Sequence, residues 1–76
     1  MTNAEKARRQ GQRNLKEAKG ILALYQEDEL DAIDVIDIAA SMGRLITMQL
    51  ESVAAIEAPA LSAMLRQTLN QPMKGH

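Results

Sequence analysis

The segment from residue 30 to residue 56 is apolar around most of a helical circumference. On a helical wheel its large side chains cover roughly 200°, whereas a surface helix usually carries a stripe little over about 100° wide. A helix of this kind has to be covered from at least two directions. The rest of the chain can cover one of them, and we expect a second copy or another protein on the other. The residues that we assign to the core or to self-association are Val35, Ile36, Ile38, Met42, Leu45, Ile46, Leu50 and Val53.

The length of 76 residues suits one small domain. A core of this size rarely supplies more than about 3–5 kcal/mol unless a disulfide, a metal or oligomerisation reinforces it. Cysteine is absent and the only histidine is the last residue, His76, so oligomerisation is the favoured reinforcement. Tyr25 is the only aromatic residue, and a core of Leu, Ile, Val, Met and Ala is typical of helix bundles.

Apolar residues recur at steps of three and four along most of the chain, which predicts an all-α fold. We expect helices over residues 3–26, 29–57 and 60–70 and a loose tail over residues 71–76. The first two helices would form a long antiparallel hairpin, with the short third helix as a brace. Two copies, joined along the second helix, would make a dimeric helical bundle.

Helix-end signals support these boundaries. Thr2 and Glu5 have the spacing of a capping box, and Asp28 or Asp31 can cap the second helix. Pro59 ends the second helix and suits the first position of the third.

The net charge of −1 conceals a strong asymmetry along the chain. Residues 1–19 carry six Lys or Arg against two Glu, and residues 20–37 carry six acidic residues and no basic one. This polarity can steer an antiparallel hairpin or a head-to-tail contact. It defines two candidate partner-binding clusters, a basic face of Lys6, Arg9, Arg13 and Lys16 and an acidic cluster of Glu27, Asp28, Glu29, Asp31 and Asp34.

The basic face could lie along nucleic-acid phosphates or meet the acidic groups of a neighbouring protein, or it could simply be solvated. Nucleic acid is the less favoured partner, because aromatic stacking residues are lacking and the sequence pI is near 5.7. The acidic cluster suits helix capping first and docking on a basic protein surface second. A metal is not expected there, because the spacing does not match a calcium-binding loop.

Catalysis is not expected either. The chain has no internal His, no Cys and no glycine-rich phosphate loop, so we expect no enzyme and no cofactor. No signal peptide and no membrane span are expected, because charged or polar residues interrupt every apolar stretch, and a cytoplasmic location follows as an expectation.

The functional hypothesis from the sequence is a small non-enzymatic interaction protein. It would bind and modulate another protein as an inhibitor, a regulator or an assembly factor, of the kind frequent in phages and mobile elements. The first alternative is a nucleic-acid-binding regulator that uses the basic face of the first helix in a dimer. The second is a structural subunit of a larger helical assembly.

Overall fold

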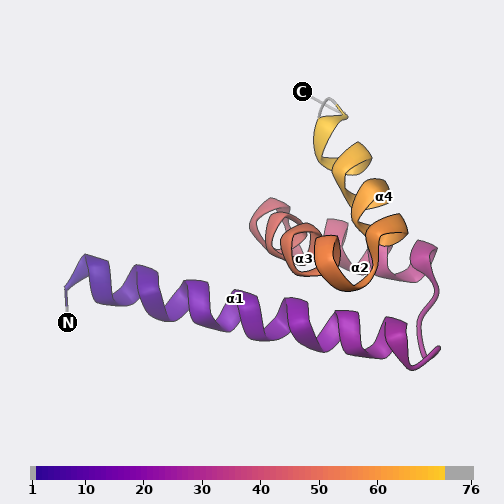
Figure 1. Ribbon diagram of the computed structural model, residues 1–76. Coiled ribbons are helices and arrows are strands. Elements are labelled where there is room, and N and C mark those ends of the chain that lie inside the picture. Colours follow the sequence, from indigo (N-terminus) through magenta and orange to yellow (C-terminus); the bar gives the residue numbers. More distant parts are fainter. Residues whose placement is uncertain (1, 72–76) are drawn as a thin grey trace.

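The computed structural model describes residues 2–71, and this part of the chain contains helices and no strand. The helices are α1 (Asn3–Gln26), α2 (Ala32–Met42), α3 (Arg44–Glu57) and α4 (Pro59–Asn70). The predicted all-helical class is confirmed for these residues (Figure 1). The tail expected over residues 71–76 lies outside the described residues, except for Gln71.

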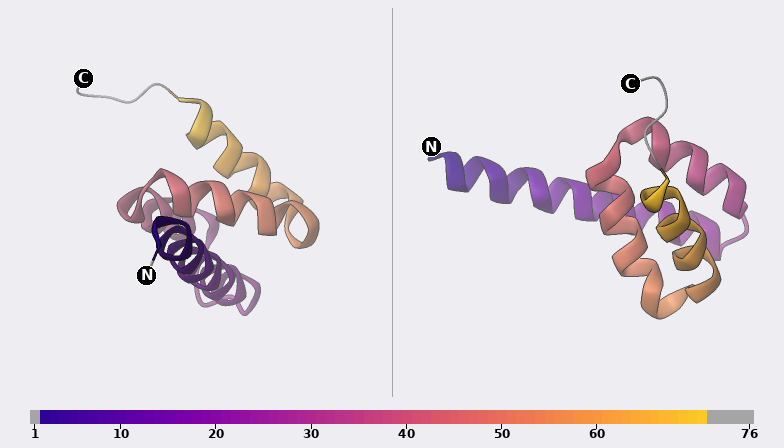
Figure 2. Two further views of the ribbon diagram at one scale, coloured as in Figure 1. Left: turned by 90° about the vertical axis from the view of Figure 1, so that its left-hand side faces the viewer. Right: turned by 90° about the horizontal axis from the view of Figure 1, so that it is seen from above.

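Helix α1 is the longest element, and only its second half contacts the rest of the molecule (Figures 1 and 2). Its first turn is capped as expected, because the Oγ1 of Thr2 accepts a hydrogen bond from the backbone N–H of Glu5 at 3.1 Å. Every residue from 2 to 10 is exposed, and the first fully buried position is Ala18. We call residues 3–14 the arm.

The turn after α1 is short and sharply defined. The backbone N–H groups of Asp28 and Glu29 donate to the last carbonyls of α1, and Asp28 adopts a left-handed conformation with φ 63°. Asp31 then caps α2, because its Oδ1 accepts from the N–H of Asp34 at 2.9 Å and the Asp34 carboxylate accepts from the N–H of Asp31 at 3.3 Å. Of the two capping candidates, Asp31 is therefore the one that acts.

The prediction of one helix over residues 29–57 is wrong, because the chain breaks at Gly43. This residue has φ 114° and ψ 173°, a conformation open essentially only to glycine. The buried hydroxyl of Thr47 supports the break, since it donates to the carbonyls of Gly43 and Ala39 at 2.9 and 3.1 Å. The second helix of the expected hairpin is thus two helices, α2 and α3. Helix α3 crosses over α1 instead of running alongside it (Figure 2).

All four helices contribute to one core. Its largest fully buried side chains are Val35, Leu50, Leu61 and Leu65. The other buried apolar residues are Ala18, Ile21, Leu22, Ala39, Ile46 and Ala54.

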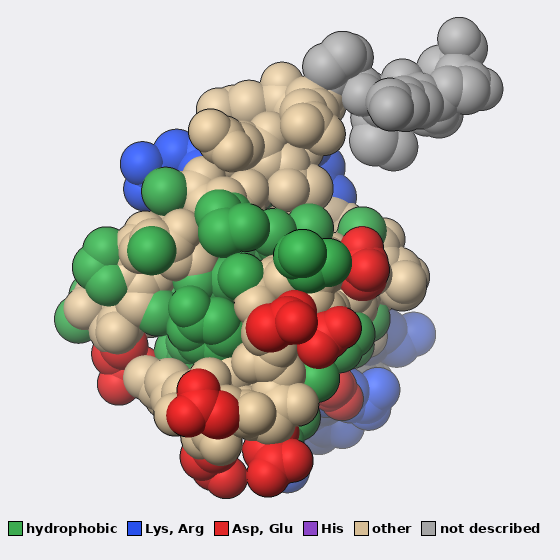
Figure 3. All heavy atoms as spheres, turned by 90° about the vertical axis from the view of Figure 1, so that its right-hand side faces the viewer, with side chains coloured by type: hydrophobic (Ala, Val, Ile, Leu, Met, Phe, Trp, Pro, Cys, Tyr) green, Lys and Arg blue, Asp and Glu red, His purple; other side chains and the backbone are tan. Residues whose placement is uncertain are grey.

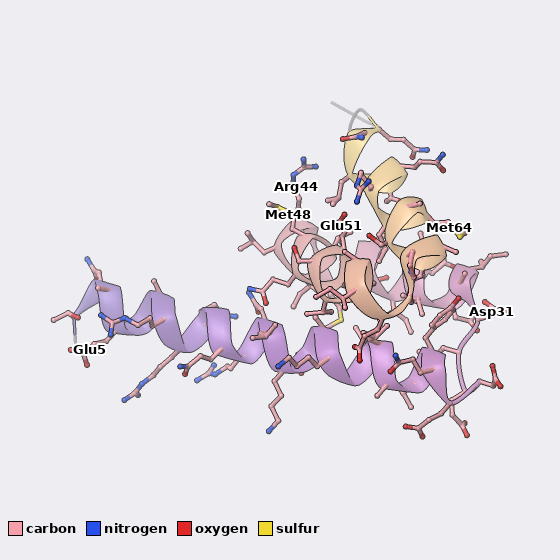
Figure 4. All side chains as sticks on the ribbon, in the orientation of Figure 1. Glu5, Asp31, Arg44, Met48, Glu51 and Met64 are labelled. Carbon is pink, nitrogen blue, oxygen red and sulfur yellow. The ribbon has the colours of Figure 1, made fainter. Side chains whose placement is uncertain are left out.

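Helix α4 covers α3 more completely than the sequence suggested. Pro59 occupies its first turn, and Leu61 and Leu65 are buried in the core. Arg66 donates from Nε and Nη2 to the Glu51 carboxylate of α3 at 3.0 and 2.8 Å. This ion pair joins α4 to one side of α3, α1 crosses another side, and Leu45, Met48 and Ile56 of α3 stay exposed (Figure 4).

Candidate protein-binding surface

The uncovered side of α3 carries large apolar side chains in a row. Leu45, Met48 and Ile56 are 65%, 46% and 87% exposed, and their spacing of three and eight residues places them on one side of the helix. Figure 4 shows Met48 on the side of α3 that lies away from α4. Scattered exposed apolar residues are ordinary, but a row on one helical side is typical of an interaction surface.

The second half of α1 extends this row beneath α3. Leu15, which is 37% exposed, lines an open hollow of about 340 Å³ at the crossing of the two helices. The remaining lining comes from Met48, Gln49, Ser52 and Val53. A second hollow of about 550 Å³ shares Val53 and is lined also by Lys19, Leu22, Gln26, Ile56 and Glu57. We call Leu15, Leu45, Met48, Val53 and Ile56 the α1–α3 surface.

One residue that lines the first hollow, Gln49, carries an unsatisfied polar atom. Its Oε1 is buried and has no hydrogen-bond donor within residues 2–71. A buried acceptor without a partner costs about 1–3 kcal/mol. This oxygen has almost no exposed surface, so it is not part of the surface that a partner would contact.

Cations border the α1–α3 surface along one flank of α1. Arg8 and Lys19 lie seven residues before and four residues after Leu15, which places all three on the same flank of the helix. Lys19 itself lines the larger hollow. Both cations are exposed, and the one ion pair within residues 2–71 joins Arg66 to Glu51, far along the chain from them.

The predicted basic face lies elsewhere on the same helix. All four of its residues are exposed, three of them within the arm, and they turn away from the small residues Ala4, Ala7 and Gly11. This face is therefore open to solvent but is separate from the α1–α3 surface. Its members are Lys6, Arg9, Arg13 and Lys16.

The acidic cluster lies at the opposite end of the molecule from the arm. Figure 3 views this end and shows acidic side chains below an apolar patch. Asp31 and Asp34 serve as caps for α2, whereas the other acidic residues of the cluster are exposed in the turn. Ile33 follows the Asp31 cap by two residues and is 67% exposed, and Met64, which is 36% exposed, lies on the same side of the molecule as Asp31 (Figure 4). We call the acidic cluster with Asp37, Ile33 and Met64 the acidic end.

The residues assigned to the core or to self-association divide into three groups. Val35, Ile46 and Leu50 are buried within the chain itself, and Ile36, Ile38 and Val53 are half-buried. Only Met42 and Leu45 are exposed, at 42% and 65%. The single chain thus covers most of the apolar arc that suggested a dimer, and the dimer remains a prediction.

Sequence reasoning missed Leu15, Met48, Ile56 and Ile33 as surface residues. The spacing of residues 45, 48, 52 and 56 was a usable signal for α3, but only the direction of α4 shows that this side is uncovered. Within residues 2–71, no cluster of His, Cys, Asp or Glu has the arrangement of a metal site.

None of the helices described here has the length and apolar content needed to cross a membrane. Comparison with protein-family models, with curated proteins and with solved structures found no match. The function is therefore inferred from the surfaces of this chain alone.

Proposed function

We propose that this chain is a small non-enzymatic protein that binds another protein through the α1–α3 surface and so modulates it. The observation that supports this function is the row of Leu45, Met48 and Ile56 on the side of α3 that α4 leaves uncovered. Leu15 widens the row and lines an open hollow together with Met48. Apolar centres with few oriented polar groups are typical of protein interfaces.

The mode of action would be steric. A chain of this size can cover a functional surface of its partner or hold two partners together, which corresponds to an inhibitor, a regulator or an assembly factor. The partner would present an apolar ridge, with acidic groups beside Arg8 and Lys19. A helix laid into the crossing of α1 and α3 has this form.

Site-specific photo-crosslinking in the host cell tests the proposal. A photoreactive amino acid at Met48 should crosslink one defined protein, and the same amino acid at exposed Gln67 on α4 should not. Leu45→Glu with Met48→Glu should abolish the crosslink formed from a photoreactive residue at Ser52 without unfolding the chain, because both side chains are exposed. Equal crosslinking from Met48 and Gln67, or no effect of the double substitution, would contradict the proposal.

One observation favours a nucleic-acid regulator as the second candidate. The arm projects from the molecule, and its basic face is exposed without an ion pair among residues 2–71 (Figure 1). Binding to duplex DNA would weaken with salt by about one unit of log–log slope per phosphate contacted. Arg9→Glu with Arg13→Glu should abolish it, and binding that survives this change would exclude the arm as a nucleic-acid surface.

A further inference from the structure

We infer that the α1–α3 surface of one copy binds the acidic end of a second copy, so that the chain associates head to tail. The inference uses the same surface as the proposed function. It is tested on the purified chain alone, so the two can fail separately.

The two surfaces match in kind. The α1–α3 surface has an apolar centre beside Arg8 and Lys19, with one acid, Glu57, in the larger hollow, and the acidic end has an apolar centre beside acids alone. On α2, Asp37 lies four residues after Ile33 and three residues before Ala40. This spacing places the acidic and apolar side chains next to each other on one side of the helix. Ile33 and Met64 could contact the apolar row of α3 while Asp37 meets Arg8 or Lys19.

A head-to-tail contact also pairs the opposite charges of the chain. Residues 1–19 contain six basic and two acidic residues, and residues 20–37 contain six acidic residues and no basic one. A contact made by the α1–α3 surface of both copies would not bring Arg8 and Lys19 to the acidic end. Like charges across an interface are unfavourable, whereas a head-to-tail contact pairs opposite charges.

The positions of the two surfaces also permit head-to-tail association. Met48 and Met64 lie on opposite sides of the α3–α4 unit, so one copy can use both surfaces at once (Figure 4). Each repeat of a contact between two different surfaces adds another copy. The assembly stays open unless the rotation between neighbouring copies closes it into a ring. The average mass should therefore rise continuously with protein concentration and should not stop at a dimer.

Light scattering on the purified chain across concentration and salt is the primary test. We expect the average mass to rise with concentration at low salt and to fall as salt is added, because salt screens the opposite charges. A mass that stays at one copy at the highest concentration would overturn the inference. A closed dimer that is insensitive to salt would overturn it as well.

Charge reversal identifies the two surfaces. Arg8→Glu with Lys19→Glu changes the rim of the α1–α3 surface, and Glu29→Lys with Asp37→Lys changes the acidic end without touching the caps Asp31 and Asp34. Each variant alone should associate about tenfold more weakly or worse, because like charges then meet. An equimolar mixture of the two should regain association, because every contact between unlike variants again pairs opposite charges.

A matched control separates this contact from general attraction between charges. Arg9→Glu with Arg13→Glu makes the same charge change on the side of α1 away from Leu15, and it should leave most of the association intact. Equal loss in this control, or a mixture that does not recover, would overturn the inference. Far-UV circular dichroism should show the same helix content in every variant, because all the substituted side chains are exposed.

Discussion

The two halves of α1 have the same helical periodicity but different surroundings. In the second half, the inward positions are Ala18, Ile21 and Leu22, and all of them are buried. In the arm, the corresponding positions are small, and Ala4 and Ala7 stay exposed. Periodicity thus determines that both halves are helical, whereas side-chain size determines which half packs against the core.

This difference explains why the arm is not packed against the core. A helix of about twelve residues is marginal in water when nothing covers it. The arm is extended from an anchored helix and capped by Thr2, so it is presented in helical form without being held by the core. The following substitutions test the contrast between the core and the uncovered parts, from the largest expected effect to the smallest.

Leu50→Ala should have the largest effect on stability. Leu50 is fully buried, and loss of a buried leucine side chain costs about 2–5 kcal/mol in transfer and cavity energy. Leu45→Ala is the matched control on the uncovered side of α3 and should change the free energy of unfolding by less than about 0.5 kcal/mol. Denaturant unfolding measures both values, and similar losses would show that the two sides of α3 are equally covered.

Gly43→Ala should destabilise the chain by about 1–3 kcal/mol, because alanine is strained at the backbone angles of the break. Gly11→Ala in the arm is the control. It has open space for the added methyl group and should favour the arm helix by up to about 1 kcal/mol. If Gly43→Ala lowers the unfolding temperature no more than Gly11→Ala does, the glycine conformation at residue 43 is not required for the break between α2 and α3.

Asp31→Ala removes the cap of α2 and should cost about 0.5–2 kcal/mol of global stability. Thr2→Ala removes the cap of the arm and should leave global unfolding almost unchanged, because the arm contributes little to the core. Urea titration of the two variants gives the comparison directly. Equal destabilisation would mean that the arm unfolds together with the core.

Gln49→Leu should have the smallest effect, and in the opposite direction. Replacing a buried acceptor that lacks a donor with an apolar side chain should be neutral or should stabilise the chain by up to about 1 kcal/mol. Calorimetric unfolding measures this change, and a clear loss of stability would show that Gln49 is satisfied in solution.

The sequence predicted the parts of this fold that depend on local signals. The extent of α1, its Thr2 cap and the start of α4 at Pro59 follow from capping and proline chemistry. The break at Gly43 was missed because the apolar pattern continues through it on a single wheel. One glycine inside a helix of that expected length was the available signal.

The candidate site was only partly predictable. Exposure of the basic face follows from helical periodicity. The participation of Leu15 and Met48 in one hollow does not, because it depends on the angle at which α3 crosses α1. That angle depends on packing between residues far apart in the chain, such as Leu22 of α1 and Leu50 of α3 in the shared core.

Amide hydrogen exchange along α1 in dilute solution tests the division of this helix most directly. The arm, residues 3–14, should exchange rapidly, and the amides around Ala18, Ile21 and Leu22 should exchange only with global unfolding, because these side chains are part of the core. Uniform slow exchange over the whole of α1 would contradict the central claim that the arm lies outside the core.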